Sequence, residues 1–409
     1  MWRVAASNVT RESQLTLYDQ SRMQPRYKRF GAFMAPFHPP TENPLLALER
    51  DLELLTWLDE LAFDEVWVGE HHSAGWEYIA SPELFLAVAA ERTRHIKLGT
   101  GVVSLPYHHP MLVAERMAFL DNMTRGRVLF GVGPGALVTD ALMLGVEPTR
   151  TRPMMEEALG VILRLFTETD PITVESDWFC LRDAVLQVRP YSKPYMPLAV
   201  ASMQSPAGPV LAGKYGAGLL SIGVFIGFRG AVDLKAQWQL AEEAAAQAGQ
   251  TVNRDEWRLV MPIHLAETRH EAIAQIHERG TAWLTRYQRD ILGRPLPEGV
   301  PEERMVETLA ESGSWIVGTP DDCAAAIDRL DSLSGGFGGL LVMVQDWATR
   351  EQQRRSLELL ARYVMPRYTG ALAGVEAGHR LGVAQRVEGQ TAMKRSIDQA
   401  FETREQMTA

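Results

Sequence analysis

Short apolar runs alternate with longer amphipathic segments along most of the chain. From Arg29 onward, each apolar run is followed by a segment whose apolar residues recur at helical spacing. This order is typical of repeated βα units around a parallel sheet. The predicted strands are Phe30–Met34, Val66–Val68, Ile96–Val103, Val128–Val132, Leu198–Ala201, Leu219–Ser221, Leu259–Leu265 and Leu340–Val344. They predict an α/β fold, a closed (β/α)8 TIM barrel with insertion loops at the C-terminal face of the strands.

Capping signals and apolar stripes predict the helices between these strands. Asn43 and Ser81 each precede a proline and can cap a helix, and Thr349 with Gln352 forms a capping box at the last helix. Two further helices are expected at Met111–Asn122 and near Met154–Phe166. The residues expected to face the core are Leu45, Leu48, Leu52, Leu55, Leu58 and Ala62, then Leu84, Phe85, Val88 and Ala89, and finally Leu357, Leu360, Ala361 and Val364.

The same pattern divides the chain into three parts. Residues 1–28 are polar and carry no core pattern, so we interpret them as an N-terminal extension. Residues 29–366 carry the barrel, and residues 367–409 form a polar C-terminal arm or tail. Within the barrel, Thr173–Tyr195 can hold a hairpin. The segment Trp283–Gly318 is rich in proline, glycine and charge, and it is a candidate lid.

Composition narrows the class of protein. The 41 basic and 51 acidic residues give a formal charge of -10, which would repel nucleic acids and anionic membranes, so neither is expected as a partner. The first 28 residues lack the apolar stretch of a signal peptide, and no segment is long and apolar enough to span a bilayer. Cys180 and Cys323 have no metal or redox spacing. The sequence therefore predicts a soluble, cytoplasmic protein.

The segments that directly follow the strands should carry the chemistry, because such a barrel places its active site at the carboxyl ends of its strands. Methionine, aromatic, histidine and glycine residues dominate there. This mixture suits a large planar ring held between apolar side chains, although the same residues could simply fill the barrel mouth. The segments are Phe33–His38, Glu70–His72, Gly101–His109, Gly131–Ala136, Ala201–Ser205 and Gln345–Trp347.

Two adjacent histidines follow the second strand. Neighbouring residues of an extended chain point to opposite sides, so only one of them should enter the pocket, and we assign this position to His71. A histidine there can donate or accept a proton, and a histidine satisfied by backbone partners in the barrel wall is the alternative. Ser202 and Ser205 precede a helix and could hold a phosphate, although N-capping would explain one of them.

A set of motifs resembles one known family, the bacterial luciferase-like flavin-dependent monooxygenases. The resemblance covers roughly residues 30–366 and implies a reduced flavin, FMN or FAD, at the barrel mouth. It also implies a separate reductase that uses NAD(P)H to reduce the flavin, which then reacts with O2. The motifs are Phe30-Gly31-Ala32-Phe33, Ala62 to His72 (AFDEVWVGEHH), Leu98-Gly99-Thr100-Gly101-Val102, Leu105-Pro106 with His109-Pro110, and Leu120-Asp121 with Gly126-Arg127.

The resemblance assigns roles to individual residues. His71 matches the family's active-site histidine, and Gly101-Val102 matches its non-prolyl cis peptide beside the flavin. Ser202 and Ser205 match the phosphate-binding loop, whereas Pro134 departs from the pattern, because bacterial luciferase has a phosphate-binding arginine there. The predicted site comprises His71 as the catalytic residue, Met34, Gly101, Val102, Gly133, Ser202, Met203 and Ser205 as cofactor-binding residues, and Phe37, Tyr107 and Trp347 in the substrate pocket, with no metal ligand.

Within the family, the Met34–Pro40 segment and the Gly133-Pro134-Gly135 turn look most like the limonene monooxygenases. The resemblance thus implies epoxidation of a monoterpene alkene, or of a similar small apolar molecule, by a homo-oligomer. Another luciferase-like oxidoreductase is the alternative: F420-dependent hydride transfer, or an alkane, alkanesulfonate or aldehyde monooxygenase. A metal-dependent hydrolase would need a convergent, carboxylate-bridged ligand set, which the spacing does not indicate. A non-catalytic flavoprotein subunit is the third alternative.

Overall fold

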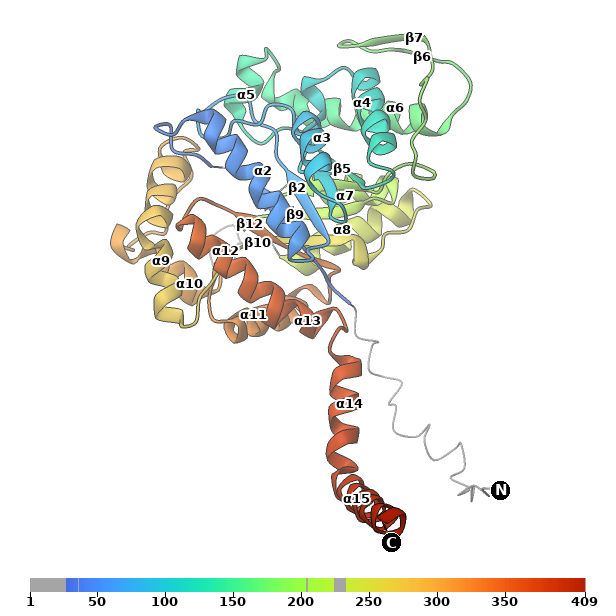
Figure 1. The fold of residues 1–409 in the computed structure, drawn as a ribbon. Helices are drawn as coiled ribbons and strands as arrows, with labels where there is room; N and C mark the ends of the chain where they lie inside the picture. The colour runs from blue at the N-terminus through green and yellow to red at the C-terminus, as the bar shows by residue number, and fades with distance from the viewer. Residues whose placement is uncertain (1–26, 36, 204, 224–232, 409) are drawn as a thin grey trace.

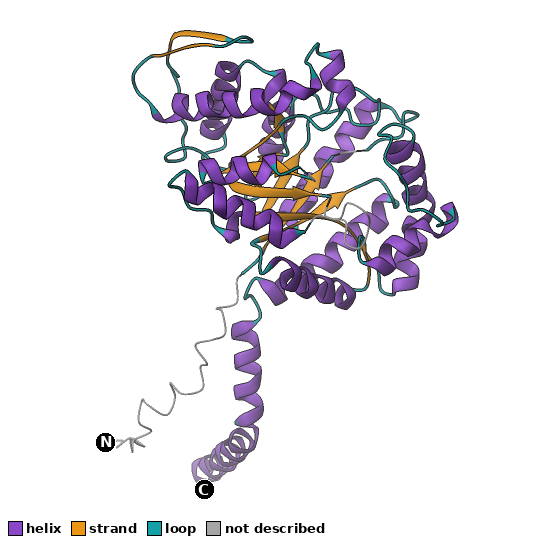
Figure 2. Cartoon of the chain, turned by 180° about the vertical axis from the view of Figure 1, so that it is seen from behind, coloured by secondary structure: helices purple, strands orange, loops and turns teal. Residues whose placement is uncertain are grey.

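A closed barrel of eight parallel strands forms the centre of the molecule (Figures 1 and 2). The computed structural model describes residues 27–35, 37–203, 205–223 and 233–408. Around the barrel the strands follow the order β1 (Arg29–Met34), β2 (Glu65–Val68), β3 (Lys97–Thr100), β5 (Val128–Gly133), β8 (Leu198–Ser202), β9 (Gly218–Ile222), β10 (Trp257–Leu265) and β12 (Gly339–Val344). Because β12 pairs with β1, the ring is closed, and the predicted TIM barrel is confirmed.

Helices surround the barrel (Figure 2). The Asn43 side chain accepts a hydrogen bond from Leu45 N at the first of them, and Thr349 with Gln352 forms the predicted capping box, but Ser81 makes no side-chain cap. The longer covering helices are α2 (Pro44–Glu60), α3 (Pro82–Arg92), α4 (Pro110–Met123), α6 (Thr151–Thr167), α7 (Ala207–Tyr215), α8 (Leu234–Gln247), α9 (Arg269–Ala282), α11 (Pro320–Ser334) and α12 (Arg350–Leu359).

The core has an inner and an outer layer, because successive side chains of each strand point to opposite faces. Phe33, Trp67 and Leu341 belong to a cluster inside the barrel. Their neighbours Met34 and Val66 belong to the larger cluster between strands and helices. Which face a residue joins therefore decides whether it can reach the barrel mouth.

Two of the predicted helix stripes are partly wrong. Leu45, Leu84 and Val88 are 70, 66 and 47% exposed, and Ala62 lies outside α2. Helix α3 buries Ala89 as predicted, but Leu86 takes the place of Leu84 and Val88, because the face turned toward the barrel is narrower than the apolar surface of this helix. The predicted third strand is also divided: β3 ends at Thr100, the Gly101–Val102 peptide is cis, and the short β4 (Val103–Ser104) follows.

The segment predicted as a lid forms a second small core at the barrel mouth. It contains η4 (Trp283–Arg289), a π-helical segment, followed by η5 (Glu302–Arg304), α10 (Met305–Ser312) and β11 (Ile316–Gly318), which pairs with β10. Trp283 and Tyr287 pack there against Phe37, which follows β1, and Trp315 packs against Trp283 in the same cluster. The hairpin expected within Thr173–Tyr195 is present as β6 (Ile172–Glu175) and β7 (Cys180–Ala184).

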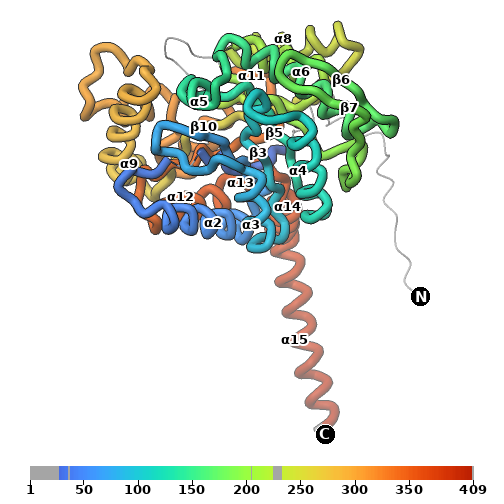
Figure 3. Tube along the Cα trace, turned by 90° about the horizontal axis from the view of Figure 1, so that it is seen from above, coloured from blue at the N-terminus to red at the C-terminus, as the bar shows by residue number. Residues whose placement is uncertain are grey.

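The C-terminal residues form helices that project from the barrel (Figures 1 and 3). After α13 (Met365–Tyr368), α14 (Ala373–Ala384) and α15 (Arg386–Thr408) are exposed along their length. Of the predicted N-terminal extension, the described residues include Tyr27 and Lys28, and the rest lies outside them. None of the described helices combines the length and apolar character that crossing a bilayer requires.

Candidate active site

A cavity of about 260 Å³ opens at the C-terminal face of the barrel. Residues that follow several different strands line it, together with residues of the segment 283–294. Eight of the residues predicted for the site line this cavity: Phe37, His71, Gly101, Val102, Gly133, Ser202, Met203 and Ser205. The chain thus brings together residues that are far apart in sequence, at the end of the barrel where chemistry was expected.

Three predicted site residues do not line the cavity. Met34 is fully buried in the outer core layer, because its neighbour Phe33 takes the inward position. Trp347 stacks on Trp315 with ring centroids 4.1 Å apart, inside the second core. Tyr107 ends the short helix η1 (Leu105–Tyr107), and its ring meets the edge of His72; burial raises the pKa of Tyr107 to about 12.

Glycine and small backbone groups form one wall of the cavity. Thr100 Oγ1 both donates to Gly131 O at 2.8 Å and accepts from Gly131 N at 2.9 Å, which ties β3 to β5. A Cβ at Gly133 would lie 2.5 Å from Val102 Cγ2. Glycine is therefore required at Gly133 by its neighbour Val102 as well as by any ligand that approaches this wall.

The rim after β8 carries hydroxyl groups, and a cation from another helix lines the same cavity. Ser205 Oγ accepts from Ala207 N at 3.2 Å, at the first turn of α7, and Ser202 Oγ accepts from Gln237 Nε2 at 2.8 Å. The exposed Arg152 of α6 also lines the cavity. Backbone N–H groups at a helix start, with a guanidinium nearby, form an arrangement suited to a phosphate.

The second rim group is the His71 cluster, which comprises His71, Glu77, Asp140 and Tyr287. His71 Nε2 lies 3.0 Å from Glu77 Oε2, and His71 Nδ1 lies 3.1 Å from Asp140 Oδ2. Asp140 lies on α5 (Val138–Met143), and Tyr287 on η4 donates its hydroxyl to Glu77 Oε1 at 2.5 Å. The segment 283–318, here called the insertion, therefore contacts His71 indirectly, through the hydrogen bond from Tyr287 to Glu77.

Hydrogen bonding and charge favour a protonated His71. Burial alone would disfavour the imidazolium, but the carboxylates of Glu77 and Asp140 outweigh it and raise the pKa of His71. Burial raises the pKa of Glu77, whereas His71 and Tyr287 oppose this. Asp140 is also buried, yet the donors His71 and Ser73 hold its pKa below the usual range. The pKa values of both His71 and Glu77 are thus raised, and their facing atoms lie 3.0 Å apart at the cavity wall.

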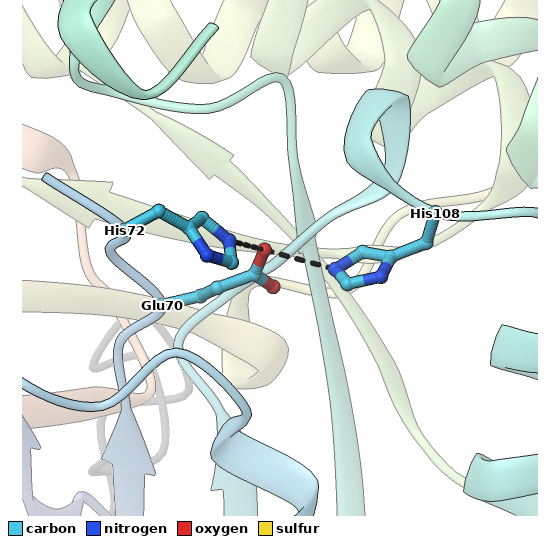
Figure 4. A group of neighbouring side chains, drawn as sticks. All are labelled: Glu70, His72 and His108. Atoms are coloured by element: carbon cyan, nitrogen blue, oxygen red, sulfur yellow. Dashed lines mark hydrogen bonds and ion pairs between the residues drawn. The ribbon is translucent and has the colours of Figure 1, made fainter. Parts of the chain in front are cut away.

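Next to it lies the Glu70 cluster, which comprises Glu70, His72, His108 and the backbone N–H of Ser104. Figure 4 shows the carboxylate of Glu70 between the two imidazole rings. His72 Nε2 and His108 Nε2 each lie 2.9 Å from Glu70 Oε1, and Ser104 N donates to Oε2 at 3.0 Å. Burial would raise the pKa of Glu70, but these donors lower it, and Glu70 raises the pKa of His72.

The Glu70 cluster is also a convergent set of metal-ligand atoms, all within 4.8 Å of one another. The spacing of the sequence did not indicate such a set. However, the hydrogen bonds account for all three side chains, and His108 Nδ1 faces the guanidinium of Arg116 at 3.3 Å. A metal-binding histidine normally donates its second nitrogen to an acceptor, which a guanidinium is not.

Sequence reasoning missed several residues that line or control the cavity. Glu77 lies in the loop between β2 and α3, and Asp140 lies on the short helix α5, and no sequence motif marks either of them. Tyr287 on η4 and Arg152 on α6 are far in sequence from the ends of the predicted strands. Gln345 begins the segment Gln345–Trp347 after the last predicted strand, but the sequence indicates no role for it. Its position directly after the predicted strand Leu340–Val344 is the one signal that the sequence offers.

Comparison with known proteins places this geometry in a family. The sequence profile described as luciferase-like monooxygenase matches residues 28–335. The 4-hydroxyprotoasukamycin monooxygenase of Streptomyces nodosus subsp. asukaensis is 48% identical over 371 residues, which span 90% of this chain and 99% of that protein. Limonene 1,2-monooxygenase of Rhodococcus erythropolis is 45% identical over 344 residues, spanning 84% and 87% of the two chains.

A solved structure has the same fold. The oxygenating constituent of 3,6-diketocamphane monooxygenase from Pseudomonas putida, in complex with FMN, superposes with a TM-score of 0.70 at 24% identity, covering 83% of this chain and 98% of that one. The family profile spans most of the barrel, and both curated relatives exceed 40% identity. The chain therefore belongs to the luciferase-like monooxygenases and is a flavin-dependent enzyme of that family.

Proposed function

We propose that the enzyme uses reduced flavin and O2 to add one oxygen atom to an alkene of a small, largely apolar molecule, as in the epoxidation of limonene. The observation that carries the proposal is the cavity itself, where apolar walls meet a histidine that forms an ion pair with a buried carboxylate. The names of the two relatives, one acting on limonene and one on 4-hydroxyprotoasukamycin, support oxygen insertion into organic molecules of this kind.

The lining residues fit a flavin. Val102 and Met203 offer apolar surface for a planar ring, and the bare backbone at Gly133 allows close approach. Ser205 and the start of α7 can bind the phosphate, and Arg152 supplies the cation that Pro134 cannot. FMN is favoured over FAD because a related fold carries FMN.

In the reaction, reduced flavin supplies two electrons and two hydrogens, so that alkene and O2 become epoxide and water while the flavin is oxidised. His71 holds a proton at Nε2 and can return it after giving it up, because Glu77 and Asp140 stabilise the charged ring. Trp283 and Leu292, from the segment 283–294, line the cavity with apolar surface that disfavours water beside the substrate. A separate NAD(P)H-dependent reductase supplies the reduced flavin, and assembly as a homo-oligomer stays a prediction.

The test combines the enzyme with a flavin reductase, NADH, FMN, limonene and ¹⁸O2. We expect limonene epoxide that carries one labelled oxygen atom, and no epoxide when the enzyme is omitted. Oxidation of NADH that yields only hydrogen peroxide, with FMN and with FAD, would contradict epoxidation of limonene. Reduction of F420 with an alcohol substrate would instead support the hydride-transfer alternative.

A further inference from the structure

One polar side chain of the cavity has no described partner. Gln345 follows β12 and lines the cavity, as well as two small neighbouring cavities of about 20 Å³ each, and 6% of its surface is exposed. Neither its amide nitrogen nor its amide oxygen forms a hydrogen bond within the described part of the chain. Buried polar groups are nearly always bonded, and an unbonded amide destabilises the protein unless a ligand or water meets it.

A second unpartnered donor lies on the same cavity. Trp283 of η4 is 6% exposed, and its indole N–H has no acceptor among the described residues. The neighbouring wall is apolar, because Phe37 packs against the Trp283 ring with centroids 5.7 Å apart, and Met343 lines the cavity nearby along β12. Beside this apolar wall, Gln345 and Trp283 therefore carry hydrogen-bonding atoms that no described residue satisfies.

These two groups are separate from the rim suited to phosphate. Ser202 and Ser205 follow β8, and β12 is three strands further around the barrel, after β9 and β10. A phosphate at the start of α7 therefore leaves Gln345 for another group. In the His71 cluster, Glu77 Oε1 accepts from Tyr287, whereas Glu77 Oε2 faces His71 at 3.0 Å without a hydrogen bond, and neither oxygen bonds Gln345.

We propose that the Gln345 amide, assisted by the Trp283 N–H, binds a carbonyl or hydroxyl oxygen of the substrate. The substrate would then be an oxygen-bearing alkene rather than a pure hydrocarbon. This inference rests on the proposed function and sharpens it. A carbonyl accepts from the amide N–H, and a hydroxyl can also donate to the amide oxygen, whereas a hydrocarbon leaves both atoms unpaired.

The experiment compares limonene with carvone, which has the same carbon skeleton and one added ring carbonyl. Calorimetric titration of the full chain, with and without FMN, gives both dissociation constants in the absence of turnover. We expect carvone to bind about tenfold more tightly than limonene, the effect of one buried hydrogen bond. Gln345→Met should remove most of this preference by weakening carvone binding, and Trp283→Phe should reduce it to a smaller extent.

Gln239→Met is the matched control, because it makes the same chemical change at an exposed position on α8. It should retain the full preference for carvone. Equal affinities of the unmodified chain for the two ligands would overturn the proposal, whether or not Gln345→Met folds. Equal weakening of both ligands by Gln345→Met would also overturn it, since that result indicates packing alone.

A loss of FMN affinity in Gln345→Met, with the carvone preference retained, would assign the amide to the cofactor and overturn the proposal as well. The proposed function fails by a different result, the absence of epoxide during turnover. The two failures are distinguishable because the titrations measure binding only.

Discussion

His71 and His72 are neighbours in sequence, yet they belong to clusters of opposite composition. In the His71 cluster one imidazole meets two carboxylates, those of Glu77 and Asp140. In the Glu70 cluster one carboxylate meets two imidazoles. The first arrangement favours a charged ring that faces the cavity, and the second favours a carboxylate that fixes the adjacent loops. The number of carboxylates relative to imidazoles in each cluster, rather than the histidine itself, therefore decides which group is charged.

The largest effect should come from removing His71. We expect His71→Ala to lower kcat by about 10²–10⁴-fold, the usual contribution of a positioned acid or base. FMN affinity should stay within about threefold, because both ring nitrogens face carboxylates rather than the cavity walls suited to flavin. His72→Ala is the matched control and should change kcat by less than about fivefold, since His72 does not line the cavity. Equal losses of epoxide formation in His71→Ala and His72→Ala would contradict a specific catalytic role for His71.

The next effect concerns stability. Glu70→Ala removes the acceptor of His72, His108 and Ser104 N, so we expect it to lower the free energy of unfolding by about 2–3 kcal/mol. Urea denaturation measures this loss. Glu70→Gln retains an acceptor oxygen and should lose less. A loss below about 0.5 kcal/mol in Glu70→Ala would show that the cluster does not stabilise the fold.

The stability difference between the unmodified chain and Glu70→Ala should also depend on pH. Donors lower the pKa of Glu70 despite burial, so its contribution is present above the ordinary value of 4.5 and is lost as pH falls through the lowered one. The hydrogen bond to Glu70 raises the pKa of His72, so that contribution is present below 6.5 and is lost as pH rises through the raised value. The stability difference between the unmodified chain and Glu70→Ala should therefore be largest between pH 4.5 and 6.5. A difference that is constant from acid to alkaline pH would contradict this.

A smaller effect is expected from Tyr287→Phe in the His71 cluster. Removing the hydroxyl takes a donor from Glu77, whose pKa then rises further, so Glu77 competes better with His71 for a proton. The pKa of His71 should fall by less than about one unit, although Asp140 and the more distant Glu70 still favour the charged ring.

Nitrogen-15 NMR of the histidine rings measures this in the flavin-free protein, and the pH profile of kcat/KM should move in the same direction. Tyr78→Phe is the control, because Tyr78 lies on the same loop as Glu77 but donates to Pro39 O at 3.3 Å. If the pKa of His71 is unchanged in Tyr287→Phe, or shifts equally in both variants, Tyr287 does not influence the protonation of His71.

The barrel could be predicted because its signals are local. Apolar runs at regular intervals and the caps at Asn43 and Thr349 act within a few residues, and the structure confirms both caps. The helix faces were less predictable, as Leu84 and Val88 show, because an apolar side chain carries no information about which neighbour will cover it.

The site could be predicted only where it follows the strands. Segments after the strands contributed His71, Gly133 and Ser202, because barrel geometry brings all strand ends to one face. Contacts from the insertion could not be predicted, since Tyr287 and Glu77 are 210 residues apart and no pattern links them. The inward or outward orientation of a strand residue also matters. On β1, Phe33 points into the barrel, so the next residue, Met34, points outward and does not reach the cavity.

The smallest expected effect is that of zinc on the Glu70 cluster. The cluster offers two imidazole nitrogens and a carboxylate oxygen, which are the donors that zinc prefers. A nitrogen that binds metal must lack its proton, which then resides on the other ring nitrogen. At His108 that other nitrogen faces Arg116, a donor without lone pairs, so the proton stays on Nε2 and points at Glu70.

Equimolar zinc should therefore change the thermal midpoint by less than about 1 °C, because a ligand that does not bind the native state does not stabilise it. Arg116→Met tests the reason: without the guanidinium, His108 Nδ1 is free to carry the proton, and zinc should then raise the midpoint. If zinc raises the thermal midpoint of the unmodified chain, and His108→Ala abolishes this rise, the Glu70 cluster binds zinc and the prediction is wrong. The Glu70 carboxylate would then serve a metal, and the metal-dependent alternative would regain its structural basis.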